Sequence, residues 1–228
     1  MIKIEINNKI YKLPVSFDEI LLKDYIKLMN IKELDDTKRL MLIVSSLTGC
    51  PVEDISSLKL DDIRYLYHSI QYIFEQPKYV LQPYFKIDGI YYGLNKNLEQ
   101  ITFGEYIDLE KFSNGDLDWK DIDILLSILY RPVQKKPRTN NFIKNYIYNK
   151  RIKTDIEEYN PETVKERSEL FKNNITIDKV LGAVFFFIVL RMVYMKSLEL
   201  SLSKRKKMRM LNNMLNQIGI SLNNVGVG

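Results

Sequence analysis

The chain has 228 residues, of which 46% are hydrophobic and 28% are charged. This composition is that of a globular protein and excludes a fibrous or intrinsically disordered one. A single cysteine, Cys50, excludes an internal disulfide framework and a multi-cysteine zinc site, so we expect a reducing compartment.

Residues 1–78 predict a β-hairpin followed by three helices. Apolar and polar residues alternate over 2–12 around Asn7-Asn8, a pair that tolerates the positive φ of a tight turn. Helical periodicity then predicts helices over 17–30, 36–48 and 60–75.

Residues 79–195 predict a second unit of the same kind. A hairpin is expected over 80–94 around Asp88-Gly89, and an insertion with basic residues interrupts the unit at about 133–172. The expected helices span 102–112, 118–130 and 177–195, with helical pieces at 139–152 and 161–171.

An internal repeat links the two units. Residues 19–28 align without a gap with residues 100–109, and the identical pairs are Ile20/Ile101, Tyr25/Tyr106, Ile26/Ile107 and Leu28/Leu109. Because several matched blocks follow in the same order, we interpret the chain as a duplication. The predicted fold is therefore mainly α, with two related helical modules that are each preceded by a β-hairpin.

The most hydrophobic stretch runs from Val180 to Leu190. Extended to Met195 it has sixteen residues and contains Arg191, whereas a membrane-spanning helix needs about twenty apolar residues. A helix that is apolar all round is usually buried. We therefore expect a buried core or a subunit interface, and no membrane partner.

The positive charge is concentrated in two segments. Residues 131–154 contain eight basic residues and no acidic one, and residues 196–209 contain six basic residues and one acidic one. Since the net charge of the whole chain is +5, the remainder is net acidic. Such a charge distribution suits docking on an acidic surface or on copies of the same chain.

The last segment, 196–228, begins with a predicted basic amphipathic helix over 196–218. Its apolar stripe suits packing on its own domain or on a partner. The residues that we predict to bind partners are Lys135, Lys136, Arg138, Lys150, Arg151, Lys204, Arg205, Lys207, Met208, Leu211, Leu215 and Ile218.

Nucleic acid is an alternative partner for the first basic segment. Phe142, Tyr146 and Tyr148 lie among its basic residues, and aromatic side chains stack on bases. No recognised nucleic-acid-binding motif accompanies them, and the acidic remainder of the chain argues against a dedicated binder. Protein partners are therefore the favoured interpretation.

No set of residues predicts catalysis, a cofactor site or a metal site. The polar run from Asn114 to Asp123 lacks the glycine and glutamate positions of a calcium loop, so its aspartates are interpreted as helix caps. The single histidine, His68, has no neighbouring nucleophile and acid in a recognisable spacing, so we expect a partly buried structural role. We expect a protein that is not an enzyme.

The N-terminal hairpin, the following Leu13-Pro-Val-Ser-Phe-Asp-Glu-Ile20 and Asp24-Tyr-Ile-Lys-Leu28 resemble a known group of proteins. These are small helical proteins from virion and tail gene modules of tailed bacteriophages, particularly crAss-like phages. Phe103-Gly-Glu-Tyr-Ile-Asp-Leu109 and Gly182-Ala-Val-Phe-Phe-Phe187 fit the same resemblance.

The resemblance implies a structural component of the virion, assembled in the host bacterial cytoplasm. This component would be a tail or neck ring or adaptor that binds other virion or tail proteins, as a homo-oligomer or ring. Two alternatives stay open, a tail-assembly chaperone that is absent from the mature particle and a nucleic-acid-packaging accessory protein.

Overall fold

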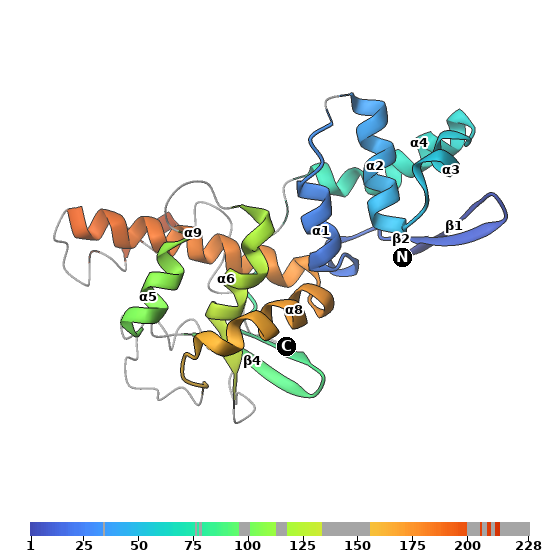
Figure 1. Cartoon of the computed structure of the whole chain (residues 1–228). Coiled ribbons are helices and arrows are strands. Elements are labelled where there is room, and N and C mark those ends of the chain that lie inside the picture. Colours follow the sequence, from blue (N-terminus) through green and yellow to red (C-terminus); the bar gives the residue numbers. More distant parts are fainter. Residues whose placement is uncertain are drawn as a thin grey trace, which may run out of the picture. The chain divides into compact units, whose positions relative to one another are not determined.

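The computed structural model describes residues 1–33, 35–75, 77, 79–95, 101–112, 118–133 and 156–199, together with residues 206, 209, 210, 213 and 214. Over 193–199 only the backbone is described. The chain forms two compact units (Figure 1). Unit 1 comprises Met1–Pro77 and Lys172–Asp178, and unit 2 comprises Lys78–Phe171 and Lys179–Gly228.

Helices dominate the described residues, and the strands form two small antiparallel sheets, which confirms the predicted mainly α fold. The elements of unit 1 begin with a hairpin and continue with helices. They are β1 (Ile2–Ile6), β2 (Lys9–Leu13), the 3-10 turn η1 (Phe17–Glu19), α1 (Leu22–Met29), α2 (Asp36–Thr48), α3 (Val52–Ser56), α4 (Leu60–Ile70) and the 3-10 turn η2 (Gln71–Phe74).

Unit 2 contains a three-stranded sheet in the order β3-β4-β5 and the remaining helices. Its elements are β3 (Tyr84–Ile87), β4 (Ile90–Leu94), α5 (Phe103–Glu110), the 3-10 turn η3 (Trp119–Asp121), α6 (Ile122–Leu129), β5 (Tyr130–Pro132), the 3-10 turn η4 (Pro161–Thr163), α8 (Val164–Asn174) and α9 (Ile177–Glu199). The last residues of α8 (172–174) and the first residues of α9 (177–178) belong to unit 1.

Both hairpins form where the turn residues predict them. Asn7, Asn8 and Asp88 have φ values of 50°, 61° and 48°, and Gly89 has a φ of 85°. These positive values are those that a two-residue hairpin turn needs. The predicted hairpins are confirmed, with Ile6 paired to Lys9 and Ile87 paired to Ile90.

The helix predicted over 17–30 is wrong in its middle. The chain is extended at Ile20, and Leu21 forms a β-bridge with Thr176. Leu22 N donates to Ile175 O at 2.8 Å, and Ile177 N donates to Ile20 O at 2.8 Å. These bonds to a distant segment satisfy the backbone groups that a continuous helix would have used.

The helix predicted over 118–130 also ends differently, because Tyr130–Pro132 forms strand β5 beside β4. Asn95 N donates to Leu129 O at 2.7 Å, which attaches the end of α6 to the sheet. The short helix α3 was not predicted. The expected helix over 139–152 lies outside the described residues, and the helix expected from 177 continues to Glu199.

Each unit has its own apolar core. In unit 1, Leu13, Ile20, Leu22, Ile55 and Ile70 are almost fully buried. In unit 2, aromatic rings of the sheet pack on one another and on Phe171 of α8. Phe85 lies 4.8 Å from Tyr130 and 5.2 Å from Phe171 between ring centroids, and Tyr92 lies 5.0 Å from Phe171.

Helix α9 supplies a buried apolar wall to unit 2. Phe186 and Phe187 are buried, and Phe185 stacks on Tyr79 with 4.4 Å between ring centroids. A Cβ atom at Gly182 would collide with the backbone oxygen of Val80, so α9 and the chain at Val80 are in close contact. Within the described part of the chain, no helix combines the length and hydrophobicity needed to cross a bilayer.

Candidate protein-binding surface on α5

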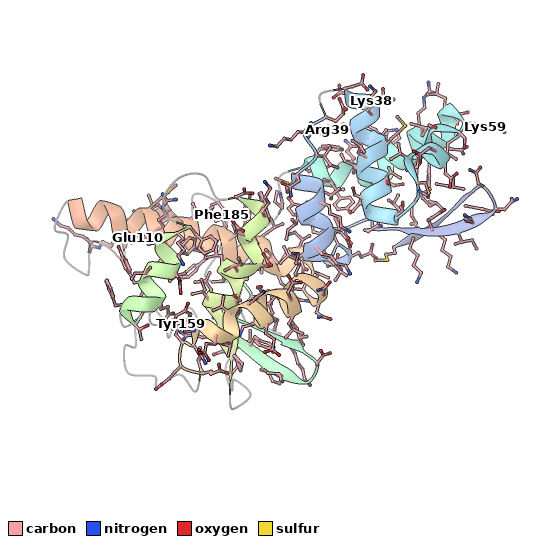
Figure 2. All side chains as sticks on the ribbon, in the orientation of Figure 1. Lys38, Arg39, Lys59, Glu110, Tyr159 and Phe185 are labelled. Atoms are coloured by element: carbon pink, nitrogen blue, oxygen red, sulfur yellow. The ribbon has the colours of Figure 1, made fainter. Side chains whose placement is uncertain are left out.

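Helix α5 presents apolar side chains to solvent. Phe103 is 77% exposed, Tyr106 is 47% exposed and Ile107 is 41% exposed. These positions follow the i, i+3, i+4 spacing of one side of a helix. Glu110, labelled in Figure 2, ends this side, and its carboxylate accepts a hydrogen bond from the Tyr106 hydroxyl at 3.5 Å. We call Phe103, Tyr106 and Ile107 the apolar stripe.

The opposite side of α5 is buried, and one of its two buried residues is charged. Glu105 is 2% exposed and Leu109 is 6% exposed. The Thr102 hydroxyl caps the helix by accepting from Glu105 N at 3.2 Å. The helix therefore buries a carboxylate while it exposes a phenylalanine, which reverses the arrangement expected for an amphipathic surface helix.

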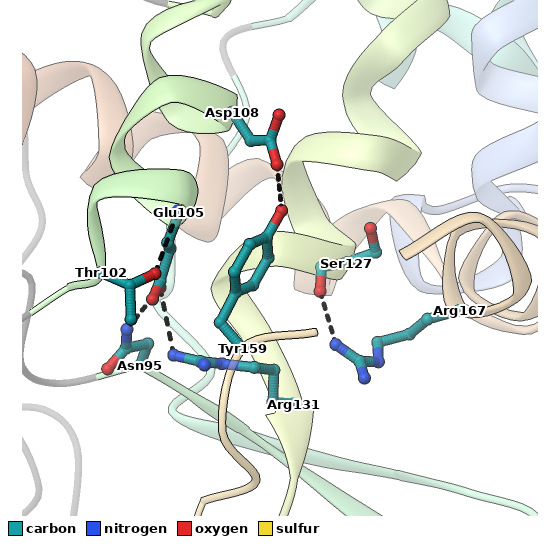
Figure 3. Close-up of polar contacts among 8 residues, drawn as sticks. All are labelled: Asn95, Thr102, Glu105, Asp108, Ser127, Arg131, Tyr159 and Arg167. Atoms are coloured by element: carbon teal, nitrogen blue, oxygen red, sulfur yellow. Dashed lines mark hydrogen bonds and ion pairs between the residues drawn. The ribbon is translucent and has the colours of Figure 1, made fainter. Parts of the chain in front are cut away.

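A buried ion pair accounts for this reversal. Arg131 Nη2, on β5, donates to Glu105 Oε1 at 3.1 Å, and both side chains are almost fully buried. Asn95 Nδ2 donates to the same oxygen at 2.8 Å (Figure 3). A buried carboxylate with a charged and a neutral donor is compensated, whereas a lone one would be very costly. The pair therefore fixes which side of α5 faces the core.

The network continues from Arg131 to the other end of α5. The Arg131 guanidinium lies 5.9 Å from the centre of the Tyr159 ring, and the Tyr159 hydroxyl donates to Asp108 (Figure 3). Lys111 Nζ donates to the other oxygen of Asp108 at 2.7 Å. The segment before α8 is thereby connected to α5, so the apolar stripe stands on a helix that is anchored at several points.

A second arginine holds the same segment. Arg167, on α8, donates from Nη1 to Ser127 O at 2.9 Å and from Nη2 to Glu157 at 3.1 Å and to Thr163 at 2.9 Å. These bonds join α8, the end of α6 and the chain ahead of η4. Desolvation by burial is the main cause that lowers the pKa values of Arg131 and Arg167 from their ordinary values.

The hydrogen bonds at Asp108 also set its charge. The bonds from Lys111 and then from Tyr159 lower the pKa of Asp108 below its usual value. Burial, followed by the bond to Asp108, raises the pKa of the Tyr159 hydroxyl. Asp108 is therefore a carboxylate and Tyr159 a protonated donor at neutral pH.

The predicted partner-binding residues are twelve side chains in the basic insertion and in the C-terminal segment. All twelve, from Lys135 to Arg151 and from Lys204 to Ile218, lie outside the described residues. Two other expectations can be compared. Asp118 caps η3 by accepting from Lys120 N at 3.0 Å, as predicted. His68 is exposed on α4, so the expected partial burial is wrong.

The apolar stripe was missed for a physical reason. Its spacing is present in the sequence, but the aligned residues Leu22, Tyr25 and Ile26 of α1 have the same spacing and are buried, so spacing alone does not separate an exposed side from a core side. The signal that distinguishes them is the pair Glu105 and Arg131, which only the folded chain brings together. Among the described residues, no group of three acidic, histidine or cysteine side chains is arranged to hold a metal ion.

No protein-family model matches this chain, and comparison with curated proteins and with solved structures gives no match either.

Proposed function

We propose that this chain is a non-enzymatic protein-binding component of a tailed-phage particle, in which it serves as a tail or neck ring or adaptor. The observation that carries the protein-binding part is the apolar stripe on α5. Contiguous exposed apolar side chains on a helix are a common feature of protein-binding sites. Phe103, Tyr106 and Ile107 would be the anchors that a partner covers.

The anchoring of α5 supports this proposal. Forming a complex costs less conformational entropy when the binding side chains are already held in place. The ion pair between Glu105 and Arg131 orients the helix, and the bond from Tyr159 to Asp108 holds its C-terminal half. The stripe is therefore presented on a preorganised support.

The class of assembly is proposed from the resemblance and from the repeat. We propose that residues 19–28 and 100–109 belong to two copies of one duplicated hairpin-and-helix module. In one copy the apolar side of the helix is used for the core, and in the other it is available to a partner. The chain would act in multiple copies, with its basic segments meeting acidic faces of neighbouring subunits.

Quantitative mass spectrometry of purified particles of the phage that encodes the chain tests this function. A fixed ratio of the chain to known tail proteins would support a structural ring or adaptor. Absence from particles, with co-purification of tail proteins from infected cells, would indicate the alternative, a tail-assembly chaperone. If the chain associates with no particle protein in either sample, the proposed function is wrong.

The same samples test the stripe. We expect Phe103→Asp to prevent incorporation into particles, because a charge replaces the most exposed anchor. Leu60→Asp is the matched control, since Leu60 is 65% exposed and begins α4 in unit 1. Equal incorporation of the two variants would show that α5 is not the binding surface.

A further inference from the structure

A pocket of about 470 Å³ opens beside the apolar stripe. Three carboxylates line it, from Asp108 on α5 and from Asp118 and Asp121 around η3. Apolar side chains of α6 and α8, among them Ile128 and Val164, complete the lining together with Tyr159. The pocket thus combines several negative groups with apolar walls.

This lining fits one kind of ligand group. A lysine or arginine side chain has a long apolar stem and a charged end, so it satisfies apolar walls and carboxylates at the same time. Among the described residues of the lining, Lys111 is the one basic side chain against three carboxylates, and Asp118 also pairs with Lys120 at 3.9 Å. Asp108 is held in its charged form by its hydrogen bonds from Lys111 and Tyr159. The pocket is therefore electrostatically suited to a cation.

The pocket and the apolar stripe are neighbours on α5. Successive residues of an α-helix are about 100° apart around its axis, so Asp108 and Lys111 lie on the side next to Ile107. A partner that covers the stripe and fills the pocket must carry apolar and basic side chains close together. This requirement narrows the partner to an amphipathic basic segment.

The chain carries such a segment at its own C-terminal end. Residues 204–209 contain five basic residues and no acidic one. Lys206, Arg209, Met210, Asn213 and Met214 are helical, and the two methionines are half-buried while the other three are exposed. Methionine packs readily on irregular apolar surfaces. At about 100° per residue, Lys206 and Arg209 lie on one side of the helix, and Met210 and Met214 lie on the side next to it.

We propose that the pocket on α5 takes a lysine or arginine side chain from the 204–209 segment of a second copy of this chain. The inference rests on the proposed protein-binding function and names its partner. Lys206 and Arg209 are exposed and do not line the pocket of their own chain. Pocket and basic segment are different surfaces, so the contact is head-to-tail and builds a ring or a filament.

Two full-length variants test the proposal by mixing. The pocket variant combines Asp118→Asn, which keeps the capping oxygen, with Asp121→Lys. The tail variant combines Lys206→Glu with Arg209→Glu. All four residues are exposed, and we expect circular dichroism and thermal unfolding to show that both variants fold. Sedimentation velocity over a range of concentrations then measures association.

We expect the wild-type chain to form oligomers whose size grows with concentration, and each variant alone to associate about tenfold or more weakly. In a mixture, the intact pocket of the tail variant can bind the intact tail of the pocket variant. No further contact is then possible, so we expect association to return and to stop at a 1:1 pair. Added salt should weaken it, because the contacts are between charges.

Three results would overturn the proposal. The wild-type chain could remain monomeric at its highest soluble concentration, either variant could associate as strongly as the wild type, or the mixture could fail to form the 1:1 pair. In each case the proposed function would still stand if the wild-type chain entered particles and Phe103→Asp did not. The stripe would then bind a different particle protein rather than the tail of a second copy.

Discussion

Helices α1 and α5 have closely related sequences but bury different sides. Leu22, at the start of α1, is fully buried, whereas the aligned Phe103 of α5 is 77% exposed. Tyr25 and Ile26 are buried, and their identical counterparts Tyr106 and Ile107 are exposed. A shared pattern of apolar residues therefore predicts the helix but does not decide which side of it faces the core.

The difference has an identifiable cause in the acidic residue that the two helices share. Asp24 of α1 is partly exposed and pairs with Lys27 on its own helix at 2.9 Å. Glu105 of α5 occupies the aligned position and pairs with Arg131 of the sheet at 3.1 Å. Because Arg131 is buried, Glu105 must be buried with it. This rotates the apolar residues of α5 towards solvent.

Removing Glu105 gives the largest expected effect. We expect Glu105→Ala to lower the free energy of unfolding of unit 2 by about 3–5 kcal/mol, since it leaves Arg131 as an uncompensated buried charge. The aligned change, Asp24→Ala, should cost about 1 kcal/mol or less, because its ion pair is largely exposed. Trp119 is the only tryptophan of the chain and belongs to unit 2. Its fluorescence during chemical denaturation therefore measures the stability of the Glu105→Ala variant. Circular dichroism during denaturation measures the stability of the Asp24→Ala variant.

A double variant sharpens this prediction. Glu105→Met combined with Arg131→Met removes both charges and retains apolar volume, so we expect it to be more stable than Glu105→Ala. If the double variant is the less stable of the two, the ion pair is not what orients α5. Equal losses for Glu105→Ala and Asp24→Ala would contradict the comparison of the two helices.

The aligned pair Leu22 and Phe103 gives the next largest contrast. We expect Leu22→Ala to cost about 2–5 kcal/mol, the usual range for a buried leucine that leaves a cavity. Phe103→Ala should change the free energy of unfolding by no more than about 0.5 kcal/mol, as is common at exposed positions. Thermal and chemical unfolding of both variants measures this contrast. A large loss for Phe103→Ala would mean that the stripe is part of a core rather than a surface.

The sequence predicts local features well because their causes are local. The positive φ of Asn7-Asn8 and of Asp88-Gly89 follows from residue type. The break in α1 and the strand after α6 depend on bonds to Thr176 and to β4. Such pairings join residues far apart in sequence, so periodicity does not reveal them.

The features of the candidate site that depend on contacts between distant residues were likewise not predicted from the sequence. The sequence predicts twelve partner-binding residues in the basic insertion and in the C-terminal segment, and all twelve lie outside the described residues. The apolar stripe could not be distinguished from core, because the same residues are buried in α1. The pocket depends on Tyr159, which follows the basic insertion and reaches Asp108 only in the folded chain. Of its three carboxylates, those of Asp118 and Asp121 were interpreted from sequence as helix caps, and Asp108 was given no role.

Alanine substitutions at Gly104 on α5 and at Gly182 on α9 compare how closely other parts of the chain pack against the two helices. A Cβ at Gly104, on α5, meets no atom within 4 Å, whereas a Cβ at Gly182 would meet the backbone of Val80 and Leu81. We expect Gly182→Ala to destabilise unit 2 by about 1–3 kcal/mol, because the backbone must move to admit the methyl group. Gly104→Ala should stabilise by up to about 1 kcal/mol through helix propensity. Differential scanning calorimetry gives both values, and a stabilising Gly182→Ala would show that α9 does not touch the backbone at Val80.

The smallest expected effect concerns Asp108 and depends on pH. Its pKa is lowered in the folded chain by the hydrogen bonds from Lys111 and Tyr159, so folding favours the charged carboxylate. The stabilisation is present above the ordinary aspartate pKa of about 3.9 and is lost as the pH falls through the lower, folded value.

Because Asp108 is partly exposed, we expect a contribution of about 0.5–1 kcal/mol. Urea unfolding of the wild type and of Asp108→Asn at pH 7 and at pH 3 measures it, and the two proteins should differ more at pH 7 than at pH 3. Asp24→Asn is the matched control, since it removes a similar i, i+3 pair from α1 without a tyrosine bond. If Asp24→Asn has the same pH-dependent effect as Asp108→Asn, the bond from Tyr159 adds nothing, and the C-terminal half of α5 is held by its own helix alone.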